Sequence, residues 1–272
     1  MAHDGKRPKV LVPTGYGLNC EAETMFAVSS AGGEPVPMHI ADMVAAGPAV
    51  LADKAMVIFI GGFSFGDHIA SGRALAHLLR ARLGDDLVRF VDDGGAILGI
   101  CNGFQVLVKM GLLPAFGRRP GDPVAPQQVS LTANDRLGYR DAWVRLRIDR
   151  RSPCIFTRGI DRDVFECPAR HGEGKLVFGD EATLPRLAEA GRIPVRYAGE
   201  DGEPTTRWPD NPNGSPEGAA GLCDASGRIF GLMPHPEAFA YRENHPDWMD
   251  PAGPPAPPAA PLLRAGLTAL AR

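Results

Sequence analysis

The sequence lacks the features that mark several large classes of protein. Its 29 Lys and Arg residues against 32 Asp and Glu residues give a formal net charge of −3, so it has no basic surplus to attract nucleic acid or an anionic membrane. No run reaches the roughly 18 apolar residues of a membrane-spanning helix, because the best stretch, residues 55–60, ends at Gly61 and Gly62. We therefore expect neither nucleic acid nor a membrane as a partner.

The sequence also lacks cysteines arranged for metal binding. Its five cysteines include no C-x-x-C pair and have no clustered histidine partners, so we expect no bound metal. The N-terminal residues lack the apolar core of a secretory signal, and we expect the protein in the reducing cytoplasm. The cysteines are Cys20, Cys101, Cys154, Cys167 and Cys223.

The composition is that of an ordinary globular protein. The 272 residues are 44% hydrophobic and 22% charged, and a chain of this length buries about 70–75% of its unfolded surface without disulfides or a structural metal. In the first half, short Val- and Ile-rich runs alternate with amphipathic stretches, which is typical of βα units around a largely parallel sheet. We expect strands at residues 9–12, 56–60 and 96–100, and helices at 20–30 after an Asn19 cap, at 69–83, at 87–91 and from Asn102.

The second half has an α+β character. Residues 143–148 alternate apolar and charged side chains, as in an antiparallel strand with one wet face, and further strand-like runs lie at 193–197, 218–223 and 229–233. We place one domain at residues 1–249 and a Pro-rich tail with a short helix at 250–272. The tail carries a stripe that either folds back onto the domain or docks on a partner, formed by Leu263, Leu267 and Leu270.

A candidate nucleophile lies where a predicted strand meets a predicted helix. Gly99-Ile-Cys101-Asn-Gly103 is a cysteine version of the G-x-S-x-G elbow, whose glycines leave room for a tight turn that projects the nucleophile. The helix from Asn102 directs backbone N–H groups and the positive end of its dipole at the sulfur, which favours the reactive thiolate. A buried, inert thiol is the commoner state of a lone cysteine. We assign that state to the other four cysteines and expect Cys101 to be the nucleophile.

A candidate base and its partner lie in Met233-Pro-His235-Pro-Glu237, just after a predicted strand. Residues i and i+2 of an extended chain point to the same side, and the proline after His235 disfavours a helix there, so Glu237 can orient the imidazole. A nucleophile, an imidazole and a carboxylate form the triad used in acyl transfer. Alone, the segment is equally compatible with a Pro-flanked surface turn, and the elbow is what makes it a catalytic candidate.

A glycine-rich loop follows the strand at 56–60, so its amides lie at the same carboxyl edge of the sheet as Cys101. The loop begins Gly61-Gly-Phe63-Ser-Phe-Gly and lacks the Lys-Ser/Thr of a nucleotide-binding P-loop. A backbone N–H of Gly61, Gly62 or Phe63 could complete an oxyanion hole with that of Asn102. A tight turn that needs glycine for backbone geometry alone explains the loop equally well.

Together these segments resemble the triad-type (class I) glutamine amidotransferases, and among them the glutaminase subunits of phosphoribosylformylglycinamidine synthase. The first loop, Gly15-Tyr-Gly-Leu-Asn-Cys20, departs from the compact Pro-Gly-x-Asn-Cys of that family, and the resemblance is thin between residues 115 and 140. The matching segments are Asn19-Cys-Glu21, Gly61-Gly-Phe-Ser-Phe-Gly-Asp67, Leu98-Gly-Ile-Cys-Asn-Gly-Phe-Gln105, Gly111-Leu-Leu-Pro114, His171-Gly-Glu-Gly174, Asn211-Pro-Asn-Gly-Ser215 and Met233-Pro-His-Pro-Glu237.

The resemblance implies a flavodoxin-like α/β fold, with a central, mostly parallel sheet flanked by helices and a smaller antiparallel sheet. It implies that Cys101 attacks the side-chain amide of L-glutamine, giving a γ-glutamyl thioester and ammonia, while His235 shuttles protons and Glu237 holds the imidazole. The Gly62 and Asn102 amides stabilise the oxyanion in this scheme. The resemblance also assigns four residues to the substrate side of the site: Gly61, Phe63, Gln105 and His171. Two of these have an alternative role, since Gln105 could serve only to pack the helix and His171 only to order its loop.

The resemblance also implies a partner. Ammonia released here must be captured, so the chain is expected to dock on an ATP-dependent synthetase subunit that aminates formylglycinamide ribonucleotide in purine biosynthesis, with or without a small bridging subunit. ATP and magnesium would belong to that partner, and this chain would carry no cofactor.

Two other functions stay open at this point. One is a different thiol hydrolase on a similar fold, such as a γ-glutamyl hydrolase or a cysteine peptidase relative. The other is a non-catalytic regulatory subunit, against which the intact Cys101, His235 and Glu237 argue.

Overall fold

The computed structural model describes residues 7–252 and 256–270, and a six-stranded sheet forms its centre. The strands of this sheet are β1 (Lys9–Thr14), β2 (Glu34–His39), β3 (Met56–Phe59), β4 (Ala96–Ile100), β10 (Gly221–Cys223) and β11 (Ile229–Leu232). Their order is β10-β11-β4-β3-β1-β2, and every neighbouring pair is parallel except β10 with β11. The expected α/β class with a mostly parallel central sheet is confirmed.

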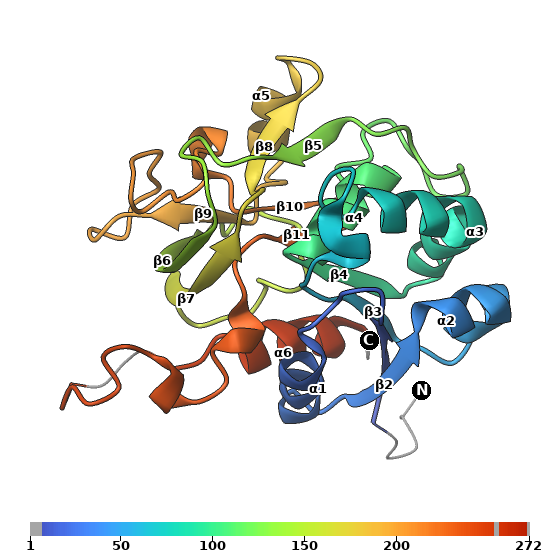
Figure 1. The fold of residues 1–272 in the computed structure, drawn as a ribbon, viewed down its shortest axis with the longest axis horizontal. Helices are drawn as coiled ribbons and strands as arrows, with labels where there is room; N and C mark the ends of the chain where they lie inside the picture. The colour runs from blue at the N-terminus through green and yellow to red at the C-terminus, as the bar shows by residue number, and fades with distance from the viewer. Residues whose placement is uncertain (1–6, 253–255, 271–272) are drawn as a thin grey trace.

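Helices cover both faces of the sheet (Figure 1). On one face α1 (Glu21–Ser30) packs beside α6 (Ala259–Leu270), and on the other α3 (Arg73–Asp92) packs against α4 (Asn102–Met110) and the short α2 (Ile40–Ala46). Because helices lie on both faces, the central strands β3 and β4 are buried at every position. Among the described residues, no helix is both long enough and apolar enough to cross a membrane.

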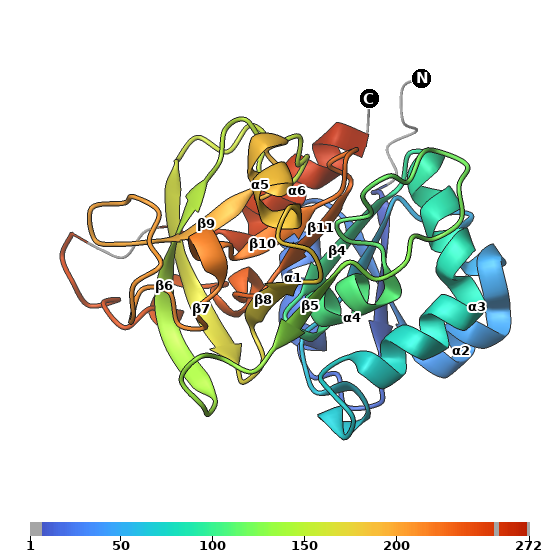
Figure 2. The ribbon, with the colours of Figure 1, turned by 90° about the horizontal axis from the view of Figure 1, so that it is seen from above.

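Two small antiparallel sheets lie beside the central one (Figure 2). In the first, β6 (Arg140–Ile148) lies between β7 (Val164–His171) and β9 (Val195–Ala198), which places residues 143–148 in the expected antiparallel setting. In the second, β5 (Val129–Thr132) pairs with β8 (Lys175–Phe178). The remaining short elements are α5 (Thr183–Glu189) and the 3₁₀ helices η1 (Gly47–Leu51), η2 (Ser64–Asp67), η3 (Pro216–Gly218), η4 (Pro236–Ala238) and η5 (Arg242–Asn244).

The leucine stripe of the tail packs back on the protein. Within α6, Leu263 and Leu267 are buried, and Leu270 packs against the same hydrophobic core. The helix lies beside α1 on the sheet (Figure 1). In this structure the stripe therefore extends the core.

Three local expectations are wrong. Cys20 occupies the N-cap of α1, and the Asn19 side chain makes no cap bond. The helices expected at 69–83 and 87–91 form the single helix α3, which continues through Gly84, where a Cβ would lie 3.3 Å from Val124. Ile69 precedes that helix with 75% of its surface exposed, so it does not belong to the buried stripe.

Candidate active site

The sheet topology brings two of the expected segments together. β4 and β11 are parallel neighbours with Ile100 opposite Leu232, so Cys101 and the segment leading to His235 leave the same edge of the sheet. The Cys101 N–H donates to the Leu232 carbonyl at 2.8 Å, which fixes this register up to the last residue of the strand.

The turn at Cys101 is tight and strained. Cys101 precedes α4 with φ 51° and ψ −106°, a left-handed conformation that side chains rarely adopt. The turn needs glycine on both sides, because a Cβ at Gly103 would overlap the carbonyl oxygen of Phe59 and one at Gly99 would lie 2.6 Å from Leu107. The side chain of Cys101 is largely buried, and its sulfur lies 3.5 Å from the carbonyl oxygen of Arg170. The structure thus forms the elbow that the sequence predicts.

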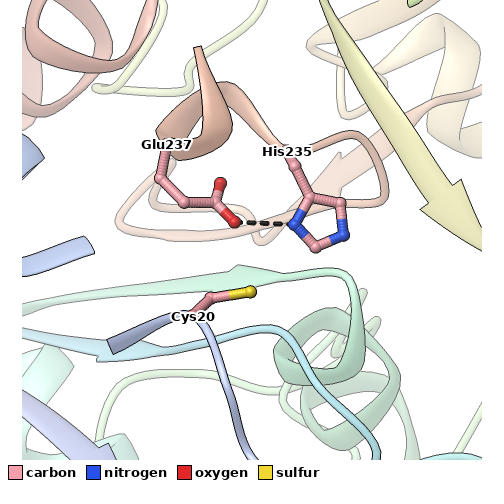
Figure 3. Close-up of side chains that lie close together, drawn as sticks. All are labelled: Cys20, His235 and Glu237. Atoms are coloured by element: carbon pink, nitrogen blue, oxygen red, sulfur yellow. Dashed lines mark hydrogen bonds and ion pairs between the residues drawn. The ribbon is translucent and has the colours of Figure 1, made fainter. Parts of the chain in front are cut away.

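A buried imidazole and a buried carboxylate form a hydrogen-bonded pair on the segment after β11 (Figure 3). His235 Nδ1 and Glu237 Oε1 are 2.6 Å apart, and both side chains are almost fully buried. Because the carboxylate accepts, Nδ1 carries the proton, and Nε2, which has no partner within residues 7–252 and 256–270, is free to accept one. Burial lowers the pKa of His235, but the negative charges of Glu237 and of a Cys101 thiolate outweigh it and raise that pKa well above 6.5.

Glycines of the loop after β3 pack closely against this pair. A Cβ on Gly61 would lie 2.7 Å from His235 Cε1 and 3.1 Å from the Cys20 sulfur, so only glycine leaves room for the imidazole. Gly62 has φ 137° and lies against the backbone of the preceding loop, where a Cβ would be 2.6 Å from Leu18 Cα. This loop therefore needs glycine for packing as well as for backbone geometry.

The backbone amides near Cys101 differ in what they bond. The Phe63 N–H donates to the Gly17 carbonyl at 2.9 Å and is therefore occupied. The N–H groups of Gly61, Gly62 and Asn102 donate to no acceptor in the described part of the chain. Of the candidate oxyanion donors, the structure therefore leaves these three available. The ring of Phe63 is 45% exposed, and its centroid lies 6.2 Å from that of Tyr139.

Gln105 and Asn102 join α4 to the loop after β7. Asn102 Nδ2 donates to Gln105 Oε1 at 3.0 Å, and Gln105 Nε2 donates to the Glu173 carbonyl at 2.6 Å. Glu173 in turn accepts from the Ser71 N–H at 3.2 Å. Both amide side chains therefore bond protein groups that position the start of α4.

His171 is a second buried histidine near the pair. Its Nδ1 lies 3.2 Å from Asn134 Oδ1, and Nε2 has no partner among the described residues. Burial lowers the pKa of His171 to about 3, and the positive charge of His235 contributes in the same direction. His171 is consequently neutral near neutral pH. Asn134 also accepts from the Gly174 N–H at 3.1 Å, so the histidine and the asparagine together order the Gly-rich loop.

A buried charged group behind the elbow is absent from the sequence-based expectations. Lys109 of α4 donates from Nζ to the Ser71 carbonyl at 2.7 Å, and burial lowers its pKa although the carboxylates of Glu173 and Asp67 oppose that shift. Asp67 accepts from the Ser71 hydroxyl at 2.8 Å, and burial raises its pKa. The only signal for this network is a lysine within an otherwise apolar helix stretch.

Cys20 was expected to be an inert thiol, yet it faces the catalytic candidates. Its sulfur and donor atoms of His235 and Glu237 all lie within 4.8 Å of one another (Figure 3). Donors of a tetrahedral zinc shell are about 3.3 Å apart, given metal bonds of about 2 Å. The 2.6 Å separation between His235 Nδ1 and Glu237 Oε1 therefore fits an N–H···O hydrogen bond better than two ligands of one metal ion. Burial raises the pKa of Cys20, so it stays a thiol. The sequence signal that could have placed Cys20 at the site is its position at the end of the loop that follows β1.

Comparisons with known proteins point to one family. The CobB/CobQ-like glutamine amidotransferase domain matches residues 7–264. The chain is 42% identical over 242 residues to phosphoribosylformylglycinamidine synthase subunit PurQ of Methanococcus maripaludis, covering 89% of this chain and 86% of that relative. It is 41% identical over 240 residues to the subunit of the same name from Dehalococcoides mccartyi, covering 88% and 89%. Among solved structures it is similar to a chain of PurLQS from Thermotoga maritima, with a TM-score of 0.71 and 26% identity over 97% of this chain and 99% of that one, which confirms the expected fold.

Proposed function

This chain belongs to the CobB/CobQ-like glutamine amidotransferase family, and on that premise we propose that it is the glutaminase subunit of a phosphoribosylformylglycinamidine synthase. As such it hydrolyses L-glutamine to glutamate and ammonia. The observation that carries the chemistry is the strained elbow of Cys101 on the sheet edge that also holds the hydrogen-bonded His235–Glu237 pair. The identity to PurQ proteins over most of both chains supports the choice of synthase.

In the first half-reaction Cys101 is the nucleophile. His235 Nε2 accepts the thiol proton, and the sulfur forms a bond to the side-chain amide carbon of glutamine. The carbonyl oxygen becomes an oxyanion, which the free N–H groups of Gly62 and Asn102 stabilise. The imidazolium then gives its proton to the amide nitrogen, the C–N bond breaks, and ammonia leaves behind a γ-glutamyl thioester.

The second half-reaction regenerates the thiol. His235 takes a proton from water as the water oxygen bonds to the thioester carbon, and the same amides hold the oxyanion. The C–S bond then breaks to release glutamate, and the imidazolium returns its proton to the sulfur. Glu237 accepts the hydrogen bond from Nδ1 throughout and keeps that proton in place, so Nε2 remains the nitrogen that exchanges protons.

The other substrate-side candidates have supporting roles in this proposal. Gln105 positions the start of α4, and neutral His171 holds the Gly-rich loop beside the site. Gly61 makes room for the imidazole. The amide of Phe63 is already bonded to Gly17, so this residue does not serve as an oxyanion donor. Its exposed ring lines the entrance to the site instead.

The proposal includes a partner for the ammonia. The chain docks on an ATP-dependent synthetase subunit, with or without a small bridging subunit, and ATP and magnesium bind to that partner. The similarity to PurQ subunits and to a chain of PurLQS supports this assembly. We place the reaction in the cytoplasm, with L-glutamine as the substrate of this chain and no cofactor bound to it.

Reconstitution with the synthetase subunit tests the proposal. We expect the wild-type complex to aminate formylglycinamide ribonucleotide with either glutamine or free ammonia, and the Cys101→Ala complex to use ammonia alone. Peptide mapping after treatment with a glutamine-like diazoketone should show label at Cys101 that excess glutamine prevents. Full glutamine-dependent synthesis by Cys101→Ala would instead indicate a regulatory subunit. Cleavage of γ-glutamyl peptides without glutamine turnover would indicate a different thiol hydrolase.

A further inference from the structure

A small cavity lies behind the carboxylate of Glu237, between the central sheet and the helices α1 and α6. About 10 Å³ of it is open to a water-sized sphere, which is room for one water molecule. Its walls are almost entirely apolar, from sheet residues such as Ile58 and Leu98 and from Leu262 and Leu263 of the tail helix. Thr24 and Glu237 are the residues with polar side chains in this lining.

Both of these polar side chains have an unsatisfied atom. Thr24 Oγ1 and Glu237 Oε2 are buried and make no hydrogen bond to any residue that the structure describes. Glu237 Oε1 is already bonded to His235, so Oε2 is the oxygen left without a donor. A buried carboxylate oxygen without a donor is costly, and a buried hydroxyl without a partner is also unfavourable. Two such atoms, on two residues that line the same water-sized cavity, indicate a common partner.

The helix α1 presents one face to the catalytic pair. Cys20 and Thr24 are four residues apart, which places them on the same side of the helix, one turn from each other. The Cys20 sulfur lies beside His235 and Glu237 (Figure 3), and Thr24 lies one turn further along at the cavity. The same face of α1 therefore lines the sulfur side of the pair and the rear of the carboxylate.

We propose that Thr24 is a positioning residue for the triad, acting through one water held in this cavity. The Thr24 hydroxyl donates to the water, and the water donates to Glu237 Oε2. Both oxygens of the carboxylate are then held, Oε1 by the imidazole and Oε2 by the water, so the plane of the carboxylate and the direction of the His235 ring are fixed. Leu262 and Leu263 close the cavity, which gives the tail helix a part in keeping bulk water away from Glu237. This inference rests on the proposed glutaminase function.

The test compares three variants in the reconstituted complex. Thr24→Val keeps the shape of the side chain and removes the hydroxyl, Thr24→Ser keeps the hydroxyl, and Thr183→Val makes the same chemical change at another buried threonine, on α5. We expect Thr24→Val to lower kcat for glutamine hydrolysis about 10-fold with KM unchanged, because the water loses the hydroxyl that anchors it and Glu237 Oε2 is no longer held. Thr24→Ser and Thr183→Val should stay within about twofold of wild type.

Two further readouts separate positioning from mere packing. The charge of Glu237 raises the pKa of His235, so a carboxylate that is no longer held in place should lower the pKa of His235 in Thr24→Val only, and histidine NMR titration measures this change. A crystal structure at high resolution should show a water within hydrogen-bonding distance of Thr24 Oγ1 and Glu237 Oε2.

The outcomes distinguish this inference from the function on which it rests. Equal losses in Thr24→Val and Thr24→Ser, wild-type kcat in Thr24→Val, or a dry cavity in the crystal would each overturn the role of Thr24 while wild-type glutamine hydrolysis stands. A wild-type complex without glutamine hydrolysis would instead remove the proposed function itself. If Thr24→Val does not fold, the crystal structure of the wild-type protein still decides.

Discussion

Two buried histidines at the site have the same burial and opposite behaviour. His171 faces the neutral amide of Asn134, and burial lowers its pKa to about 3. His235 faces the carboxylate of Glu237, and its pKa lies well above the ordinary value in spite of burial. Burial disfavours the charged form of both rings, so the partner decides the outcome. One ring is held neutral and orders a loop, and the other can carry a proton.

Of these two histidines, the arrangement leaves only His235 as a proton carrier. The positive charge of His235 is one of the causes that lower the pKa of His171, so protonation of the first ring works against protonation of the second. A second imidazolium here would compete for the thiolate and for developing negative charge. The pairing of an amide with one histidine and a carboxylate with the other therefore separates structural from catalytic use of the same side chain.

Removing the Glu237 carboxylate should make His235 behave like His171, and among substitutions around the two histidines we expect it to have the largest effect on glutamine hydrolysis. Glu237→Gln gives His235 an amide partner like that of His171, so the ring loses its ion pair and its fixed tautomer. We expect kcat for glutamine hydrolysis to fall by about 10³- to 10⁴-fold, as for loss of the orienting carboxylate in other triads. The assay is glutamate release by the complex, with ammonia-dependent amination as the control. A fall of less than 10-fold would contradict the orienting role.

The second expectation concerns stability and His171. Its pKa is about 3 in the folded state and about 6.5 in the unfolded state, so between these values the unfolded chain binds the extra proton. Neutral His171 therefore contributes to the free energy of unfolding. This contribution is fully present above pH 6.5, and it falls by about 1.4 kcal/mol per pH unit as the pH is lowered toward 3. Urea unfolding at several pH values measures this slope. His171→Asn should flatten it, and equal slopes in the two proteins would refute the assignment.

The converse change gives His171 a carboxylate partner and tests whether the partner decides the pKa of a buried histidine. Asn134→Asp should raise the pKa of His171 by one unit or more, as an opposite charge within hydrogen-bonding distance does. Histidine NMR titration measures the shift. The variant also loses the Nδ2 donor to the His171 carbonyl, so we expect about 1 to 3 kcal/mol less stability at pH 7. An unmoved titration would mean that burial alone sets the charge of this ring.

The smallest effect is expected at Cys20. Its thiol is one of the minor causes that raise the pKa of His235, and it makes no such contribution at His171. Cys20→Ala should therefore lower the pKa of His235 by less than about one unit, leave His171 unmoved, and change kcat by about threefold at most. NMR of the two rings and the glutaminase assay test this. A loss comparable to that of Glu237→Gln would place Cys20 in the chemistry itself.

The sequence predicts the fold wherever a signal is local. The buried strands β3 and β4 are continuous apolar runs, and the structure has both of them. β2 escapes prediction because Pro35 and Pro37 argue against a strand, yet it forms the edge of the sheet, where a missing N–H is tolerated. The continuity of α3 through the buried Gly84, where a Cβ would lie 3.3 Å from Val124, is not revealed by any local pattern.

The residues of the site likewise divide into those that a local sequence motif predicts and those that only the folded structure reveals. The elbow at Cys101 and the pair of His235 and Glu237 are each a short motif, and the parallel pairing of β4 with β11 brings them together. The groups that surround them come from distant parts of the chain. Asn134 beside His171 and Thr24 behind Glu237 become apparent only when the buried contacts and the cavity are known.

The backbone of Cys101 has a consequence for the history of this protein. Its positive φ is a conformation that glycine adopts freely and that costs another residue about 1 to 3 kcal/mol. Cysteine and glycine codons differ by one nucleotide, so a single mutation to glycine would relieve the strain and remove the thiol at once. In a lineage that no longer needs glutamine as a nitrogen source, the mutation that abolishes activity would therefore also relieve the backbone strain of the fold. Only continuous selection for glutamine hydrolysis keeps the thiol in place.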